Sequence, residues 1–218
     1  MTSYDFAISG QHYLFDVQSF AHTILAAGGD AYSYALLDRT TQGVIDDVAS
    51  GAAELGVIMQ TSTTEDALNS ALAEAGLAFH ELAVSAPLVA LPASHPFVNA
   101  KSLSLEQLAD FPYVYFDQGP DAPVAFFEEA LSEVPRAKKV ACTDRASLTE
   151  LIMAINGYTV TSGILVGITD GSALTTIPLE TDIKLHLGYV PADNRELSLM
   201  GERFVSHLAR SLDLYANR

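Results

Sequence analysis

Strand-like and helix-like segments alternate along the first 59 residues, and this alternation limits the folds that the chain can adopt. Short apolar runs predict strands over residues 4–8, 31–37 and 54–59. Two helices are predicted between them. One covers residues 13–27, and the other is capped by Thr40 or Thr41 and ends at Gly51. The order strand, helix, strand, helix, strand implies right-handed crossovers and parallel pairing. The sequence therefore predicts an α/β protein.

The alternation continues through the rest of the chain. A helix that ends at Gly76 is followed by an apolar stretch, residues 77–91, which is broken by Pro87 and is predicted to cross into a second lobe. Further strands are predicted over residues 113–116, 139–142, 158–161 and 183–190. Further helical segments are predicted as a short turn at 105–108, a helix from Asp121 through Leu131, a helix over 148–155 and a last helix capped by Ser198.

These elements predict two α/β lobes joined by two crossover strands. Residues 1–85 with 191–218 are assigned to the first lobe and residues 86–190 to the second. Each lobe is expected to be a mostly parallel sheet flanked by helices. A cleft then lies between the lobes, where the carboxyl ends of strands and the starts of helices meet.

Composition excludes several classes of function. With 27 acidic and 11 basic residues the formal net charge is −16, which argues against a nucleic-acid surface and against binding to anionic membranes. No apolar run is long enough to span a membrane, and residues 1–20 lack the pattern of a signal peptide, so a cytoplasmic protein is predicted. The single cysteine, Cys142, excludes an internal disulfide and is predicted to be a small buried residue.

Four segments resemble the effector-binding domain of LysR-type transcriptional regulators. Residues 48–58 are similar to the family's glycine, acidic residue and apolar strand, with Glu54 at the usual aspartate position. Residues 91–97 resemble its proline and His-Pro turn, and residues 105–114 its short helix and strand, with Gln107 at a commonly acidic position. Residues 197–204 resemble the opening of its last helix.

The resemblance implies a two-lobed fold like that of type II periplasmic binding proteins, with a small metabolite bound between the lobes. It also implies a homodimer or higher homo-oligomer that pairs side by side through the helix at residues 12–27. Leu14, Ala21 and Leu25 broaden the apolar surface of that helix, which agrees with a second partner. DNA is expected to be bound only through a helix-turn-helix, which precedes this domain in the family and is absent from this chain.

Loops at the predicted cleft supply the candidate ligand contacts. Most carry hydroxyl or amide groups suited to a small polar molecule. The candidates are Ser9, Gly10, Gln11, His12, Thr61, Gln118, Thr143, Arg145, Thr161 and Ser162. Arg145 is the only Lys or Arg in these loops, and helices that start near it and near Gln11 would direct positive dipole ends at the cleft. A carboxylate is therefore the preferred ligand, unless Asp117 or Asp144 points into the cleft.

No catalytic, metal-binding or cofactor-binding pattern is found, so no catalytic residue, metal or cofactor is predicted, and the leading hypothesis is a sensor domain rather than an enzyme. The acidic pairs Asp46-Asp47 and Glu128-Glu129 are predicted to lie on solvated helix faces. Two alternatives remain open at this point. One is a solute-binding protein of the same fold, and the other is an enzyme that would use Asp117, Asp144 or His12.

Overall fold

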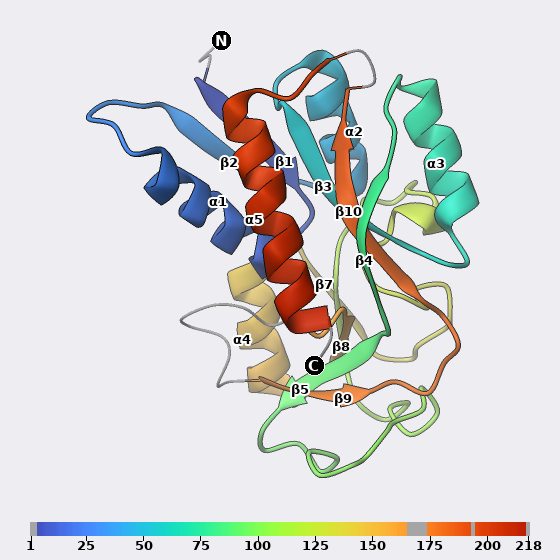
Figure 1. Ribbon diagram of the computed structural model, residues 1–218. Helices are drawn as coiled ribbons and strands as arrows, with labels where there is room; N and C mark the ends of the chain where they lie inside the picture. Colours follow the sequence, from blue (N-terminus) through green and yellow to red (C-terminus); the bar gives the residue numbers. More distant parts are fainter. Residues whose placement is uncertain (1–3, 165–173, 193–194, 217–218) are drawn as a thin grey trace.

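The computed structural model describes residues 4–164, 174–192 and 195–216 (Figure 1). Its larger sheet has the strand order β2-β1-β3-β10-β4. These strands span Phe6–Gly10 (β1), Tyr34–Asp38 (β2), Leu55–Thr61 (β3), His80–Ser85 (β4) and Leu185–Pro191 (β10). β1 pairs in parallel with β2 and β3, as the strand and helix alternation predicts, whereas β10 runs antiparallel between β3 and β4.

Four helices cover the two faces of this sheet (Figure 1). They span Leu14–Ala27 (α1), Thr41–Ser50 (α2), Glu65–Glu74 (α3) and Leu199–Ala216 (α5). α1 and α5 pack side by side on one face, and α2 and α3 lie on the other. The predicted caps are present, because Thr40 accepts a hydrogen bond from the Gly43 backbone at the start of α2, and Ser198 accepts one from the Gly201 backbone in α5.

Within the described residues, the second lobe contains two smaller sheets and one α-helix. Its elements span Leu88–Pro92 (β5), Tyr113–Phe116 (β6), Val124–Phe126 (η1, a 3-10 turn), Lys139–Cys142 (β7), Arg145–Ile155 (α4), Thr159–Thr161 (β8) and Leu174–Pro178 (β9). β6 and β7 are parallel, but β5 pairs antiparallel with both β8 and β9. The expectation of a mostly parallel sheet therefore does not hold for this lobe.

The chain crosses between the lobes twice, from β4 to β5 and from β9 to β10 (Figure 1). A strand that arrives from the other lobe enters its sheet against the direction of the β/α units, which explains the antiparallel partners of β5 and β10. β10 belongs to the first sheet. The return crossing is therefore complete before Leu185, earlier than the predicted boundary at residues 190 and 191.

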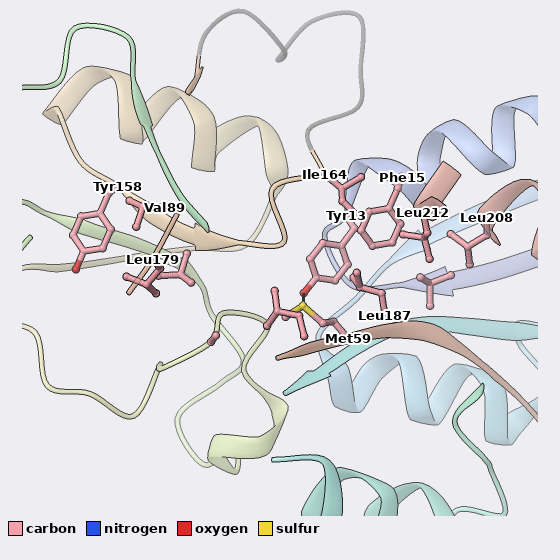
Figure 2. Close-up of a cluster of buried hydrophobic side chains, with 14 of the residues drawn as sticks. Tyr13, Phe15, Met59, Val89, Tyr158, Ile164, Leu179, Leu187, Leu208 and Leu212 are labelled. Carbon is pink, nitrogen blue, oxygen red and sulfur yellow. Dashed lines mark hydrogen bonds between the residues drawn. The ribbon is translucent and has the colours of Figure 1, made fainter. Parts of the chain in front are cut away.

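The apolar core continues across the junction between the lobes. One cluster of buried side chains includes Phe15, Leu187 and Leu208 from the first lobe and Val89 and Tyr158 from the second. Figure 2 shows these side chains in one field. Since burial stabilises by about 25 cal/mol per Å² of apolar surface, the shared core holds the lobes together as well as building each one.

The helix predicted from Asp121 through Leu131 is wrong, since only the 3-10 turn Val124–Phe126 forms there. We call residues 117–131 the bridging segment, because it leaves β6 in the second lobe and packs against the first. Ala125 and Phe126 lie in a buried cluster with side chains of α2 and α3, and Leu131 has a positive φ of 61°. These tertiary contacts require a more extended path than a helix, so they override the local periodicity. The segment at 105–108 forms a turn, as predicted.

Candidate functional site

A cavity of about 80 Å³ lies where the lobes meet. Much of its wall is apolar and comes from both lobes: Tyr13, Leu14, Ala90, Phe116, Leu148, Val160, Ile164 and Leu174. Its polar lining consists of His12, Glu128, Glu129, Arg145, Thr149, Thr159, Thr161 and Ser162. Pockets for drug-sized ligands measure roughly 300–1,000 Å³, so this cavity accommodates a small molecule in the arrangement seen.

The carboxylate of Glu128 is the centre of the polar contacts between the lobes. It accepts hydrogen bonds from the His12 backbone N–H at 2.9 Å and from the Gln118 amide at 2.8 Å, and it lies 2.8 Å from His12 Nδ1. The backbone carbonyl of Glu128 accepts a bond from the Tyr13 hydroxyl at 3.1 Å. Because Glu128 is buried, its carboxylate forms hydrogen bonds with protein donors, including the His12 backbone N–H just before α1, in place of water.

The contact between His12 and Glu128 favours the charged form of the imidazole. Burial opposes protonation of His12, but the hydrogen bond and charge of Glu128, with the charge of Asp38, outweigh it and raise the pKa of His12 above 6.5. The imidazole also stacks on the Phe116 ring, with the ring centroids 4.2 Å apart. His12 therefore contacts the second lobe through both its hydrogen bond with Glu128 and its ring face.

A chain of buried amides extends the same network across the first lobe. Gln118 accepts a hydrogen bond from the Thr41 backbone N–H at 2.8 Å, and the Thr41 hydroxyl donates to the Phe126 carbonyl at 2.7 Å. The Gln11 amide donates to the Thr41 hydroxyl, and its oxygen accepts from the Met59 backbone N–H at 2.8 Å. The bridging segment is therefore tied to the first turn of α2 and, through Gln11, to β3.

Arg145, at the start of α4, makes a second polar contact between the lobes. Its guanidinium donates to the Tyr13 carbonyl, to Asp16 Oδ1 at 3.2 Å and to Asp38. Asp16 is fully buried, and its Oδ2 has no hydrogen-bond partner in the described structure. Burial raises the pKa of Asp16 to about 7, because it outweighs the nearby positive charge of Arg145.

Glu129 differs from its neighbour Glu128. Its Oε1 accepts a hydrogen bond from the Phe116 backbone N–H at 2.9 Å, while its Oε2 has no partner in the described structure. The hydroxyl of Thr159, which also lines the cavity, is buried without a partner too. Burial and the charge of Glu128 raise the pKa of Glu129 well above its ordinary value, which favours the protonated, uncharged form of this carboxyl.

A family model described as "LysR substrate binding domain" matches residues 33–213. The match covers most of the chain and therefore decides the family. The chain belongs to the LysR substrate-binding domains. A search of curated protein sequences finds no match.

Solved structures share the fold of this LysR domain. HinK, a LysR family transcriptional regulator from Pseudomonas aeruginosa, matches with a TM-score of 0.64 and 17% identity over 95% of this chain and 70% of that chain. The reduced OxyR regulatory domain from the same organism matches with a TM-score of 0.64 and 14% identity, over 96% and 94%. The effector-binding domain of QuiR in complex with shikimate matches with a TM-score of 0.60 and 12% identity, over 94% and 95%.

The structure brings four of the residues proposed from the sequence together around the cavity. They are His12 from the β1–α1 loop, Arg145 from α4, and Thr161 and Ser162 at the end of β8. Their common location follows from strand-end positions that the sequence identified. Gln118 lies beside them and lines a separate, more open hollow on the bridging segment.

The remaining proposed residues do not line the cavity. The Ser9 hydroxyl donates to Asp47 at 2.9 Å, and Thr61 shares hydrogen bonds with two neighbouring threonine hydroxyls. Gln11 is committed to the buried network, and Thr143 is exposed at the end of β7. Gly10 has a structural reason to be glycine, since an added Cβ would lie 2.4 Å from Asp16 Oδ2.

Sequence reasoning missed Glu128 and Glu129, which it placed on a solvated helix face. Both are buried, because the bridging segment is not a helix and turns their side chains toward the junction. Their spacing in the sequence carries no signal of this role. Asp46 is exposed as predicted, while Asp47 is half-buried and accepts hydrogen bonds from Ser9 and Arg39.

Other kinds of site find little support in the part of the chain that the structure describes. No group of three or more His, Cys, Asp or Glu residues there could hold a metal ion. Cys142 is buried, and burial raises the pKa of its thiol to about 11, which opposes formation of a reactive thiolate. Asp117 and Asp144 do not line the cavity, and Asp144 caps α4 by accepting a bond from the Ser147 backbone at 2.8 Å. No described helix is long and apolar enough to cross a membrane.

Proposed function

We propose that this LysR domain binds a small polar effector in the cavity between its lobes, and that this binding regulates transcription. The cavity carries the proposal, because both lobes line it and because the contacts of Glu128 and Arg145 cross the junction at its edge. A ligand held there contacts both lobes at once. It therefore favours the closed arrangement over any arrangement in which the lobes separate.

The surface of α1 is the proposed route from the cavity to an oligomer. α1 begins beside the cavity at Leu14 and presents Leu25 to solvent with 79% of its surface exposed. Ala21 is exposed on the same helix. We expect a homodimer or higher homo-oligomer to pair through this helix. A change in the first turn of α1 then alters oligomer packing and the spacing of helix-turn-helix segments on cytoplasmic DNA.

A thermal-shift screen of metabolites against the whole 218-residue chain tests the proposal. A ligand at 100 times its Kd stabilises the folded state by about 2.7 kcal/mol, which raises Tm by roughly 5–10 °C for a domain of this size. At least one small metabolite is expected to produce such a shift.

Two tryptophan variants on α4 locate the binding. Thr149 lines the cavity, whereas Met153 lies one turn later with 42% of its surface exposed. Thr149→Trp is expected to fill the cavity and abolish the ligand-induced shift, and Met153→Trp is expected to retain it. The proposal is wrong if no metabolite stabilises the protein, or if Thr149→Trp binds the stabilising compounds as well as the unaltered chain does.

A further inference from the structure

The donors at the start of α1 already hold a carboxylate, and it belongs to the protein. The Glu128 carboxylate accepts hydrogen bonds from the His12 backbone N–H at 2.9 Å and from the Gln118 side-chain amide at 2.8 Å, and its Oε1 lies 2.8 Å from His12 Nδ1. A backbone N–H at a helix start together with a cationic side chain is the usual environment of a bound anionic ligand. The sequence predicts the carboxylate of a ligand at the start of α1, but the carboxylate of Glu128 occupies that position.

The other positive groups at the cavity are also committed. Arg145 bonds to Asp16, Asp38 and the Tyr13 carbonyl, and the first turn of α4 is capped by the side chain of Asp144. An anion that enters the cavity competes with these partners for the guanidinium, and displacing Asp16 leaves a buried carboxyl group without its basic partner. Breaking a buried charge pair in this way is strongly unfavourable.

The cavity groups left without partners are a hydroxyl and a carboxyl whose uncharged form is favoured by burial. Glu129 Oε2 and Thr159 Oγ1 are buried and unpartnered in the described structure, and both residues line the cavity. Because Glu129 Oε1 accepts the Phe116 N–H, the proton of this carboxyl belongs on Oε2, where it can be donated. The wall beside them is apolar, from Leu148, Val160 and Leu174. A cationic ligand would need an ionised Glu129, which burial and the adjacent Glu128 oppose.

We infer that the effector is an uncharged molecule with a small apolar body and a hydrogen-bond acceptor, read by Glu129 and Thr159, while Glu128 occupies the anion position at α1. This inference rests on the proposed function, because it names the ligand class of the same cavity. Glu128 thereby acts as a specificity-determining residue that excludes carboxylates.

Three probes with the same carbon chain test the ligand class: butyramide, butyrate and butylamine. Each is titrated into the whole chain near pH 7, and binding is followed by saturation-transfer NMR. Butyramide is expected to bind at least tenfold more tightly than either charged probe. Glu129→Leu removes the donor and is expected to weaken butyramide binding at least tenfold, while Glu129→Gln keeps an N–H donor and is expected to retain it.

Two variants of Glu128 test whether its side chain excludes butyrate by occupying the position at α1 or by its negative charge. Glu128→Ala vacates the position at α1, so butyrate binding is expected to rise at least tenfold. Glu128→Gln removes the charge but keeps the side chain in place, so butyrate is expected to remain excluded. Circular dichroism confirms that each variant is folded before binding is compared.

The possible failures are distinguishable. If butyrate or butylamine binds the unaltered chain as well as butyramide does, or if Glu128→Gln admits butyrate as readily as Glu128→Ala, the inferred ligand class is wrong and the proposed function stands. If none of the three probes binds the unaltered chain or any Glu128 variant, and the metabolite screen also finds no ligand, the proposed function fails as well.

Discussion

Replacing Asp16 with asparagine should remove a specific part of the pH dependence of stability. Asp16 is fully buried at the first turn of α1, where its Oδ1 accepts bonds from the Val17 backbone at 2.6 Å and from Arg145 at 3.2 Å. Asparagine keeps that acceptor and resembles the protonated acid in shape. The variant is therefore expected to fold and to retain the neutral form at every pH.

The sign and size of the effect follow from the pKa of Asp16. Burial raises this pKa from 3.8 in the unfolded chain to about 7 in the fold, so the native state binds one proton more than the unfolded state between these values. The contribution of Asp16 to the free energy of unfolding is complete below about pH 4 and is lost as the pH rises through 7. The loss is about 1.4 kcal/mol per pH unit, up to about 4 kcal/mol in total.

Urea unfolding followed by far-UV circular dichroism, at several values from about pH 5 to 8, measures the effect. The difference in unfolding free energy, Asp16→Asn minus the unaltered chain, is expected to rise by about 2–3 kcal/mol between about pH 5 and 7 and to level off near pH 8. The contribution of His12 is present in both proteins and cancels. A difference that stays constant within about 0.5 kcal/mol over this range would refute the reasoning.

Four further substitutions test other parts of the structure. Glu54→Ala removes the carboxylate that accepts hydrogen bonds from the Ser198 backbone N–H at 2.6 Å and from the Ser198 hydroxyl at 2.7 Å, just before α5. Urea unfolding should therefore show a free energy of unfolding lower by about 1–2 kcal/mol. Gly188→Ala places a Cβ 2.2 Å from the His80 carbonyl oxygen and should lower the free energy of unfolding by about 2 kcal/mol or more. The control Gly43→Ala, on α2, should leave the free energy of unfolding unchanged or raise it slightly. Leu25→Glu should lower the mass seen in sedimentation while the chain stays folded, and a monomeric unaltered chain would contradict this.

Local sequence signals were sufficient where an element depends on its own neighbours. Apolar spacing and flanking glycines located α1, α2 and β3 to within a few residues, and the strand ends identified His12 and Arg145 as residues at the junction. These signals are local because each helix buries one stripe against its own sheet. The two predicted crossings gave the two-lobed arrangement, and the resemblance to the LysR family implied the same fold.

The bridging segment could not be predicted in this way. Its apolar spacing suits a helix, but Phe126 packs against α2 and α3 of the other lobe, and Glu128 pairs with His12, 116 positions away in sequence. A contact over such a separation leaves no periodic trace in a single sequence. Ligand contacts proposed at Ser9 and Gln11 met the same obstacle, because their partners, Asp47 and Thr41, lie on a different element.

The two crossings between the lobes have a mechanical consequence. They run side by side and are bonded to each other, since the Leu179 backbone N–H donates to the Pro87 carbonyl at 3.2 Å. The return chain is also anchored beside β3, where the Lys184 carbonyl accepts the Ser62 N–H at 2.9 Å. Two adjacent chain segments bend easily about an axis that runs across both of them, but they resist rotation of one lobe about their own direction. We therefore expect any opening of this domain to bend about these two strands, so that the contacts of Glu128 and Arg145 separate together.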